Sequence, residues 1–185
     1  MNKIIFGLVL LISSGVFGQD SIGVKKELFK VNFLASGFVY EYGLSDKMSL
    51  HSNISIGFFW KYSKLLGSTT GFNVNITEQL RYYYNFERRA KKNKIIKNNS
   101  ANYFALYGSA SSKPFAGSNL ENYIYYSNYT TGVVYGINRF YGKRFTDDFN
   151  FGLGFAFSEN SKPSFIPIIN YSFGIIIFDK KSLKL

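Results

Sequence analysis

Residues 149–158, with the sequence FNFGLGFAFS, place a large apolar side chain at every odd position and a small or polar one at every even position. Successive side chains of a β-strand point to opposite faces, so this period of two predicts a strand with one apolar and one polar face. A strand that is apolar outside and polar inside is typical of a transmembrane β-barrel, in which a tilted spanning strand needs about 9–11 residues. The stretch therefore predicts one strand of such a barrel.

The same alternation recurs along the chain and predicts further strands. An even number of strands returns both ends of the chain to one side, and closing the sheet removes the edges that lipid would not tolerate. Eight strands are therefore favoured over seven, and the expected fold class is all-β, a closed antiparallel eight-stranded transmembrane β-barrel. Besides 149–158, the predicted strands span residues 27–35, 38–42, 48–61, 72–84, 102–110, 129–140 and 165–178.

Two details of this pattern have alternatives. The first two strands could instead be one long strand over residues 30–43, bent at Gly37. Glu78 interrupts the apolar face of the strand over 72–84, and a β-bulge near it would repair the register. Residues 63–70, 86–100, 111–127 and 159–164 are expected to be loops, and residues 141–148 a polar turn.

The first residues have the pattern of a secretory signal peptide. Lys3 precedes an apolar run over 4–12, and small residues follow up to Gly18. We therefore expect a signal peptide over residues 1–18 and one outer-membrane β-barrel domain over residues 19–185. No later run approaches 18 apolar residues, so the pattern predicts no transmembrane helix. A soluble periplasmic β-domain is the alternative fold.

Composition excludes several kinds of site. The chain has no Cys and one His, which excludes disulfides, thiolate metal sites and sites with several histidines, and we expect no cofactor. The 15 Tyr and 20 Phe suit strands and the aromatic girdles at the two surfaces of a bilayer. A formal net charge of +11 would also suit a nucleic-acid ligand, but the export signal argues against that partner.

Nine of the 22 basic residues fall in connections at one predicted end of the barrel. The C-terminus of such barrels lies on the periplasmic side, so residues 44–47, 86–100 and 141–148 are predicted to be periplasmic. Their basic side chains predict a rim that would meet anionic lipid headgroups or an anionic periplasmic partner. The alternative is a solvated rim that only anchors the barrel. The predicted rim residues are Arg88, Arg89, Lys91, Lys92, Lys94, Lys97, Lys143 and Arg144.

Charged side chains are also predicted inside the barrel. By alternation, Lys30, Glu41 and Arg81 face inward. The interior of an eight-stranded barrel is just filled by side chains, and an unpaired buried charge costs several kcal/mol. The pattern therefore predicts a charge network, either Glu41–Arg81 or Glu41–Lys30, that closes the interior.

His51 is the only candidate for catalysis. It shares the predicted inner face with Ser49 and Asn53, and Ser52 adjoins it. A serine activated by this histidine, with Glu41 to orient the ring, would form a hydrolase-like site. Sequence cannot supply the cross-strand geometry, so we expect no enzyme activity and keep a lipid-modifying enzyme centred on His51 as an alternative.

Several segments resemble the small outer-membrane β-barrel proteins of Bacteroidota, an eight-stranded, OmpA/OmpX-like class. They are VNFL at 31–34 with YEYGLS at 40–45, LRYYYN at 80–85, and YGINR at 135–139 with YGKRF at 141–145. The resemblance implies an eight-stranded outer-membrane barrel and implies no reaction. We therefore expect a monomer in contact with outer-membrane lipids, with a structural or interaction role. A narrow pore for small solutes is the first alternative.

Overall fold

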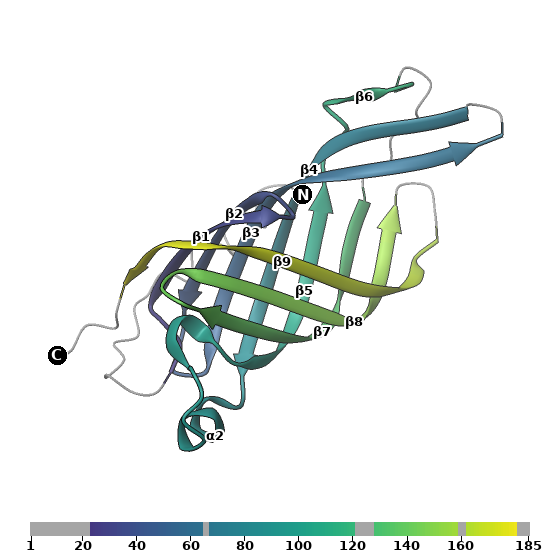
Figure 1. Cartoon of the computed structure of the whole chain (residues 1–185). Coiled ribbons are helices and arrows are strands. Elements are labelled where there is room, and N and C mark those ends of the chain that lie inside the picture. Colours follow the sequence, from purple (N-terminus) through teal and green to yellow (C-terminus); the bar gives the residue numbers. More distant parts are fainter. Residues whose placement is uncertain (1–22, 65–66, 121–127, 159–161, 181–185) are drawn as a thin grey trace, which may run out of the picture.

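Eight antiparallel strands form a closed ring of hydrogen bonds in the computed structural model, which describes residues 23–64, 67–120, 128–158 and 162–180 (Figure 1). Each strand of this strand ring pairs with two neighbours, in the order β1, β2, β3, β4, β5, β7, β8, β9 and back to β1. A further short strand, β6, pairs only with β4. The bounds are β1 Glu27–Leu34, β2 Gly37–Gly43, β3 Met48–Ser63, β4 Gly67–Tyr83, β5 Asn102–Ser111, β6 Ala116–Ser118, β7 Asn128–Tyr141, β8 Phe145–Ser158 and β9 Ser164–Lys180.

The eight predicted strands are all present, and the first two are separate. β1 and β2 form a tight hairpin, so the alternative of one long strand is wrong. The residue with left-handed backbone geometry at its turn is Ala35, with φ 53°, rather than Gly37. Gly37 instead lies against β3, where a Cβ atom would overlap the carbonyl oxygen of Ile54.

The register between β3 and β4 is continuous through Glu78. Ser52 stands opposite Glu78, and its hydroxyl donates a hydrogen bond of 2.7 Å to the carboxylate. No bulge is therefore needed at this position, and the carboxylate lies on the outer face. The register shifts occur elsewhere, between β1 and β9, next to Phe29 and next to Asn32.

The connections differ from the predicted loops. Residues 63–70 are mostly strand, because β3 and β4 extend as a long hairpin beyond the rest of the strand ring, with β6 alongside β4 (Figure 1). The predicted turn over 141–148 is shorter, because β8 begins at Phe145. Residues 86–100 contain a short helix, α2, over Phe86–Lys91 and a 3-10 turn, η2, over Lys97–Asn99. Among the described residues no helix has the length and apolar character to cross a membrane.

The antiparallel order divides the connections between two ends. The β2–β3, β4–β5 and β7–β8 connections lie at one end, here called the α2 end. The β1–β2, β3–β4, β5–β7 and β8–β9 connections lie at the other, here called the hairpin end. The three connections predicted to be periplasmic therefore share the α2 end.

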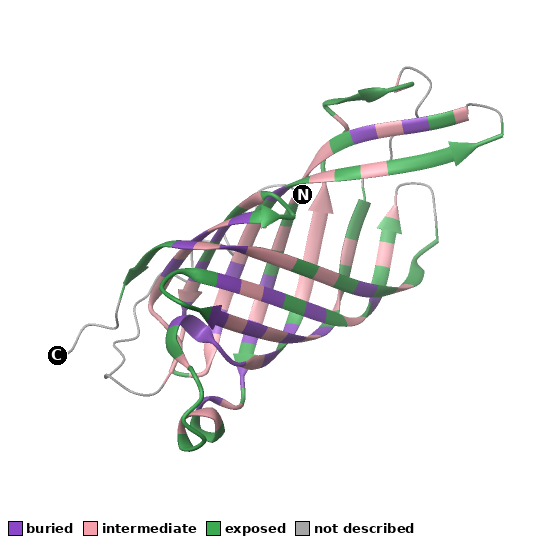
Figure 2. Cartoon of the chain, viewed as in Figure 1, coloured by how far each residue is buried: buried purple, intermediate pink, exposed green. Residues whose placement is uncertain are grey.

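Burial is inverted relative to a water-soluble sheet. On strands such as β7 and β8 in Figure 2, buried positions alternate with exposed or intermediate ones. Large apolar side chains project outward and stay exposed, such as Phe58 (64%) and Ile169 (69%), whereas Glu41 (0%) and Arg81 (1%) are buried inside. The exposed apolar residues come from all eight strands of the strand ring, among them Phe33, Phe38, Ile54, Ile76, Leu106, Val133, Leu153 and Ile177.

Apolar packing inside the strand ring gathers near the α2 end. One cluster joins Phe86 of α2 to Tyr83, Tyr103 and neighbouring buried residues. The ring of Tyr83 lies 5.3 Å from that of Phe86 and 5.4 Å from that of Tyr103, measured between centroids. A second cluster holds Leu28, Phe140 and Ile176. These two clusters fill the interior at the α2 end.

Candidate functional site in the interior

Glu41 is the centre of the first group of buried polar contacts. Its carboxylate is fully buried and lies 3.3 Å from the ammonium nitrogen of Lys30. The hydroxyls of Ser49 and Tyr83 each donate a hydrogen bond of 2.7 Å to its Oε1. Three strands beyond its own therefore supply donors to this carboxylate, which offsets the cost of burying the charge.

Arg81 is the centre of the second group. Its guanidinium is 1% exposed and forms an ion pair of 2.7 Å with Asp148 on β8. Its Nε donates to the side-chain oxygen of Gln79 at 2.9 Å, and its guanidinium carbon stands 4.2 Å above the ring of Tyr103. The hydroxyl of Tyr103 completes the group by donating to Asp148 at 2.6 Å.

The three predicted interior charges thus lie close together, but with a partner that the sequence analysis missed. Lys30 pairs with Glu41, whereas the ion pair of Arg81 is to Asp148 and not to Glu41. Tyr83 links the two pairs, because it accepts a bond of 3.4 Å from Arg81 and donates to Glu41. Two cations and two carboxylates leave this network without net charge.

Asp148 was missed because residues 141–148 have the composition of a turn. The alternation of 149–158 can be extended backward, which gives Asp148 the same parity as the inward-facing Asn150 and Gly152. Thr146 and Asp148 are indeed buried, whereas Phe145 is exposed. Strand parity carried through a polar segment was therefore the available signal.

His51 lies on the inner face with Ser49 and Asn53, as predicted, but no serine is set to be activated by it. The hydroxyl of Ser49 donates to Glu41, and Ser52 lies on the outer face with Glu78. Nδ1 of His51 is buried and has no hydrogen-bond partner among the described residues. The serine–histidine–carboxylate relay considered above is therefore not assembled. The part of the chain that the structure describes also holds no group of three or more acidic or histidine side chains suited to a metal ion.

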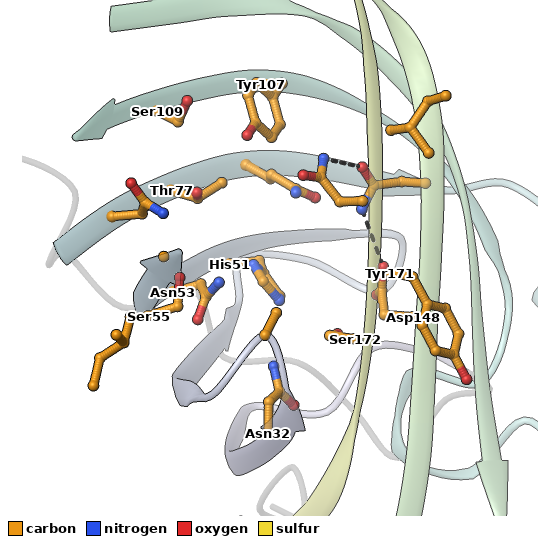
Figure 3. Close-up of a pocket in the computed structure, with 18 of the residues that line it drawn as sticks. Asn32, His51, Asn53, Ser55, Thr77, Tyr107, Ser109, Asp148, Tyr171 and Ser172 are labelled. Carbon is orange, nitrogen blue, oxygen red and sulfur yellow. Dashed lines mark hydrogen bonds between the residues drawn. The ribbon is translucent and has the colours of Figure 1, made fainter. Parts of the chain in front are cut away.

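A polar cavity of about 470 Å³ lies above this network, toward the hairpin end (Figure 3). His51, Gln79, Arg81, Asp148 and Asn150 line its inner part. In Figure 3, His51, Asn53 and Thr77 surround the same space, opposite the part of the wall that carries Ser172. The interior therefore has two halves, one packed at the α2 end and one hollow toward the hairpin end.

The basic side chains predicted to form a rim occupy the α2 end. The turn between β7 and β8 carries Lys143 and Arg144, and the others lie on α2 or in the segment that follows it. Most are exposed, although Arg89 is half-buried and donates through Nη2 to the carbonyl of Ile95 at 2.8 Å. Residues Arg88, Arg89, Lys91, Lys92, Lys94 and Lys97 come from this single connection.

One exposed ion pair joins this rim to the β2–β3 turn. Lys47 and Glu87 lie 2.9 Å apart. Their hydrogen bond and mutual attraction raise the pKa of Lys47 and lower the pKa of Glu87. The side chains of Lys47 and Glu87 are 45% and 64% exposed, so solvent screens this pair.

Comparisons with models of protein families, with curated proteins and with solved structures found no match to this chain.

Proposed function

We propose that this chain is an eight-stranded β-barrel that spans the outer membrane, with a structural or interaction role and no open pore. The observation that carries the proposal is the inverted burial: apolar side chains cover the outside of the strand ring, while two ion pairs are buried inside it. Exposure of such a large apolar surface to water is energetically unfavourable, whereas the acyl chains of a bilayer solvate it. A closed ring also leaves few unpaired backbone groups in lipid.

The interior supports a closed barrel rather than a channel. At the α2 end, Tyr83, Phe86 and Tyr103 form one buried cluster with side chains of β7 and β9, and the hydroxyl of Tyr83 joins this cluster to the ion-pair network. An eight-stranded barrel has room for side chains but little for a continuous column of water. A narrow pore is therefore the weaker proposal, and a lipid-modifying enzyme centred on His51 has no supporting contact.

The proposed orientation places the α2 end in the periplasm. Its basic rim would then meet anionic headgroups of the inner leaflet or an anionic periplasmic partner. The resemblance to small outer-membrane barrels of Bacteroidota, a monomeric state and the export signal belong to the same proposal. The signal peptide lies outside the described residues.

The test of this proposal is flotation followed by conductance. Protein refolded with phosphatidylcholine vesicles is expected to float with them after a carbonate wash and to leave a planar bilayer without steady ion conductance. Protein that stays in the aqueous fraction would contradict the membrane placement. Steady openings would contradict the closed interior and favour the pore.

Glu78 gives a second, quantitative test of lipid contact. Its carboxylate lies on the outer face between Ile76 and Leu80, both of which also face outward. Glu78→Leu is expected to raise the free energy of unfolding in vesicles by about 1–2 kcal/mol, because a carboxyl group in hydrocarbon is costly. Urea titration of protein folded in vesicles measures this change.

The matched control is Glu87→Leu, which changes an exposed carboxylate at the α2 end that pairs with Lys47. It is expected to give no gain. If both variants behave alike, the outer face does not contact hydrocarbon at position 78.

A further inference from the structure

At the hairpin end, the β1–β2 hairpin is shorter than the two strands that flank it, β3 and β9. The β1–β2 hairpin turns at Ala35 and Ser36, so the β1–β9 ladder ends at Leu34 opposite Phe173 and the β2–β3 ladder ends at Gly37 opposite Ser55. On one side of this hairpin β3 continues toward the hairpin end as far as Ser63. On the other side β9 reaches the same end at Ser164. No ladder joins β3 to β9 among the described residues, so the wall has a notch above the hairpin.

Pro167 independently marks β9 as an edge in this region. It stands opposite Leu153 of β8, in the part of β9 that extends past the end of β1. Proline has no backbone N–H and is confined to strand edges or bulges, because it cannot donate to a second ladder. The notch is therefore consistent with the local sequence as well as with the backbone.

The interior cavity reaches this notch. Ala35, at the tip of the hairpin, lines it together with Ile56 and Phe58 of β3 and Ile169 and Tyr171 of β9. These last four residues alternate with the inward-facing ones, and all four are exposed on the apolar outer face. A cavity lined both by the polar interior and by outward apolar side chains opens sideways, toward whatever solvates the outer face.

The inner end of the cavity has polar atoms without partners. Nδ1 of His51 and Oδ1 of Asn53 are buried, lie two residues apart on the inner face of β3, and have no hydrogen-bond partner among the described residues. Oδ1 of Asn53 can only accept a hydrogen bond, and the imidazole nitrogen can donate or accept one. Buried polar atoms in native structures are nearly always satisfied, which indicates that a hydrogen-bonding group, able at least to donate to Asn53, occupies this space.

The charge of the cavity restricts what can enter. Its cation, Arg81, is already paired with Asp148 at 2.7 Å, and the other two members of the network pair with each other. A ligand with net charge would find no free counterion at the inner end, so burying its charge would be costly. Hydroxyl groups suit the remaining amide and hydroxyl side chains, such as Thr77, Ser109 and Asn170.

We infer that the cavity binds an amphiphile with an uncharged, hydroxyl-rich headgroup, which enters through the notch from the membrane. The headgroup of this ligand contacts His51 and Asn53. Its alkyl chain passes through the notch, where it contacts Phe58 and Ile169 on the outer face. A volume of 470 Å³ is within the range of small-ligand sites, about 300–1,000 Å³, and would otherwise hold about fifteen waters. The inference rests on the proposed membrane placement, because the alkyl chain of the ligand needs an apolar phase outside the notch.

The experiment uses two photoreactive octyl glucosides added to the refolded full chain in phosphatidylcholine vesicles. One carries a diazirine on the sugar, and the other carries it at the end of the alkyl chain. Adducts located by mass spectrometry are expected at the inward-facing His51, Asn53 or Ser55 for the sugar probe and at residues 56–60 or 165–171 for the chain probe. Unlabelled octyl glucoside should compete with both, and glucose should not.

Two variants test the polar end. Asn53→Leu and His51→Phe are each expected to reduce interior labelling by the sugar probe about tenfold, because each removes a polar contact of the headgroup. Neither of these two atoms makes a hydrogen bond within the described residues, so both variants are expected to fold. The control is Asn128→Leu, which makes the same change at an exposed position at the start of β7 and should label like the wild type.

Several outcomes would overturn the inference. Sugar adducts confined to outward-facing residues would place the probe in the surrounding lipid only. Competition by glucose equal to that by octyl glucoside would mean entry from water and not through the notch. Unchanged labelling in both interior variants would remove the proposed contacts. Flotation of the same vesicles separates these results from failure of the membrane placement, because protein that does not float contradicts the proposed function itself.

Discussion

Asp148→Ala is expected to lower the free energy of unfolding by about 3–5 kcal/mol, because it leaves the buried guanidinium of Arg81 without its counterion. The substitution also removes the acceptor for the hydroxyl of Tyr103 at 2.6 Å. Glu41 cannot replace the lost carboxylate, because Lys30, Ser49 and Tyr83 already occupy its oxygens. Urea titration of protein folded in vesicles measures the loss.

The neighbouring residue provides the matched control. Asp147 lies on the same strand but is only half-buried, on the opposite face, where it accepts one long bond of 3.4 Å from Tyr141. Asp147→Ala is expected to change the free energy of unfolding by no more than about 0.5 kcal/mol. Equal losses in the two variants would show that the interior network is not a principal source of stability.

A double variant separates the ion pair from the packing around it. Replacing Arg81 with Met and Asp148 with Leu removes both charges and keeps apolar volume in the interior. A buried ion pair exchanged for apolar residues often costs little, so the double variant is expected to be markedly more stable than Asp148→Ala. The network would then supply specificity, by fixing which strands meet inside, more than net stability.

The alternation of side chains was sufficient to predict the eight strands and the inward faces of Lys30, Glu41 and Arg81, although it did not assign Asp148. A period of two is a local signal, and it survives in strands as different as 149–158 and 72–84. Glu78 looked like an interruption of that signal. It is instead an outward carboxylate with a partner, Ser52, on the next strand.

The features that sequence could not predict depend on pairing between distant strands. Arg81 and Asp148 are separated by 67 residues, and only the registers of the intervening strands bring them together. The notch in the wall is of the same kind, because it follows from the short β1–β2 hairpin standing between two long strands. Pro167 was a local hint of this edge, but it does not say which neighbouring strand is absent.

The packed half of the interior supports the proposed closed barrel, and the hollow half supports the proposed ligand site. The packed half at the α2 end closes the proposed barrel and makes it a poor channel. The hollow half is closed below by a network without net charge and opens sideways between β3 and β9. A closed barrel with a lateral cavity is suited to holding a molecule taken from the membrane, whereas it is not suited to passing one across.

Gly136→Val is expected to lower the free energy of unfolding by at least about 3 kcal/mol, because the interior at this position is already filled by an aromatic ring. Gly136 faces inward on β7, and a Cβ atom there would overlap the ring of Tyr103. That ring cannot move away freely, since Arg81 stacks on it at 4.2 Å and its hydroxyl donates to Asp148. The absence of a side chain at Gly136 therefore leaves room for the ring of Tyr103, which contacts both Arg81 and Asp148.

Gly108→Val is the control for this substitution. Gly108 also lies within a strand, but a Cβ atom there would have only the carbonyl oxygen of Glu78 nearby, at 4.0 Å. Valine favours strands, so this variant is expected to be neutral or slightly stabilising. In a double-mutant cycle with Tyr103→Ala, the loss from Gly136→Val should shrink, because the ring that it overlaps is gone. Additive losses in that cycle would place the damage elsewhere and contradict the packing described here.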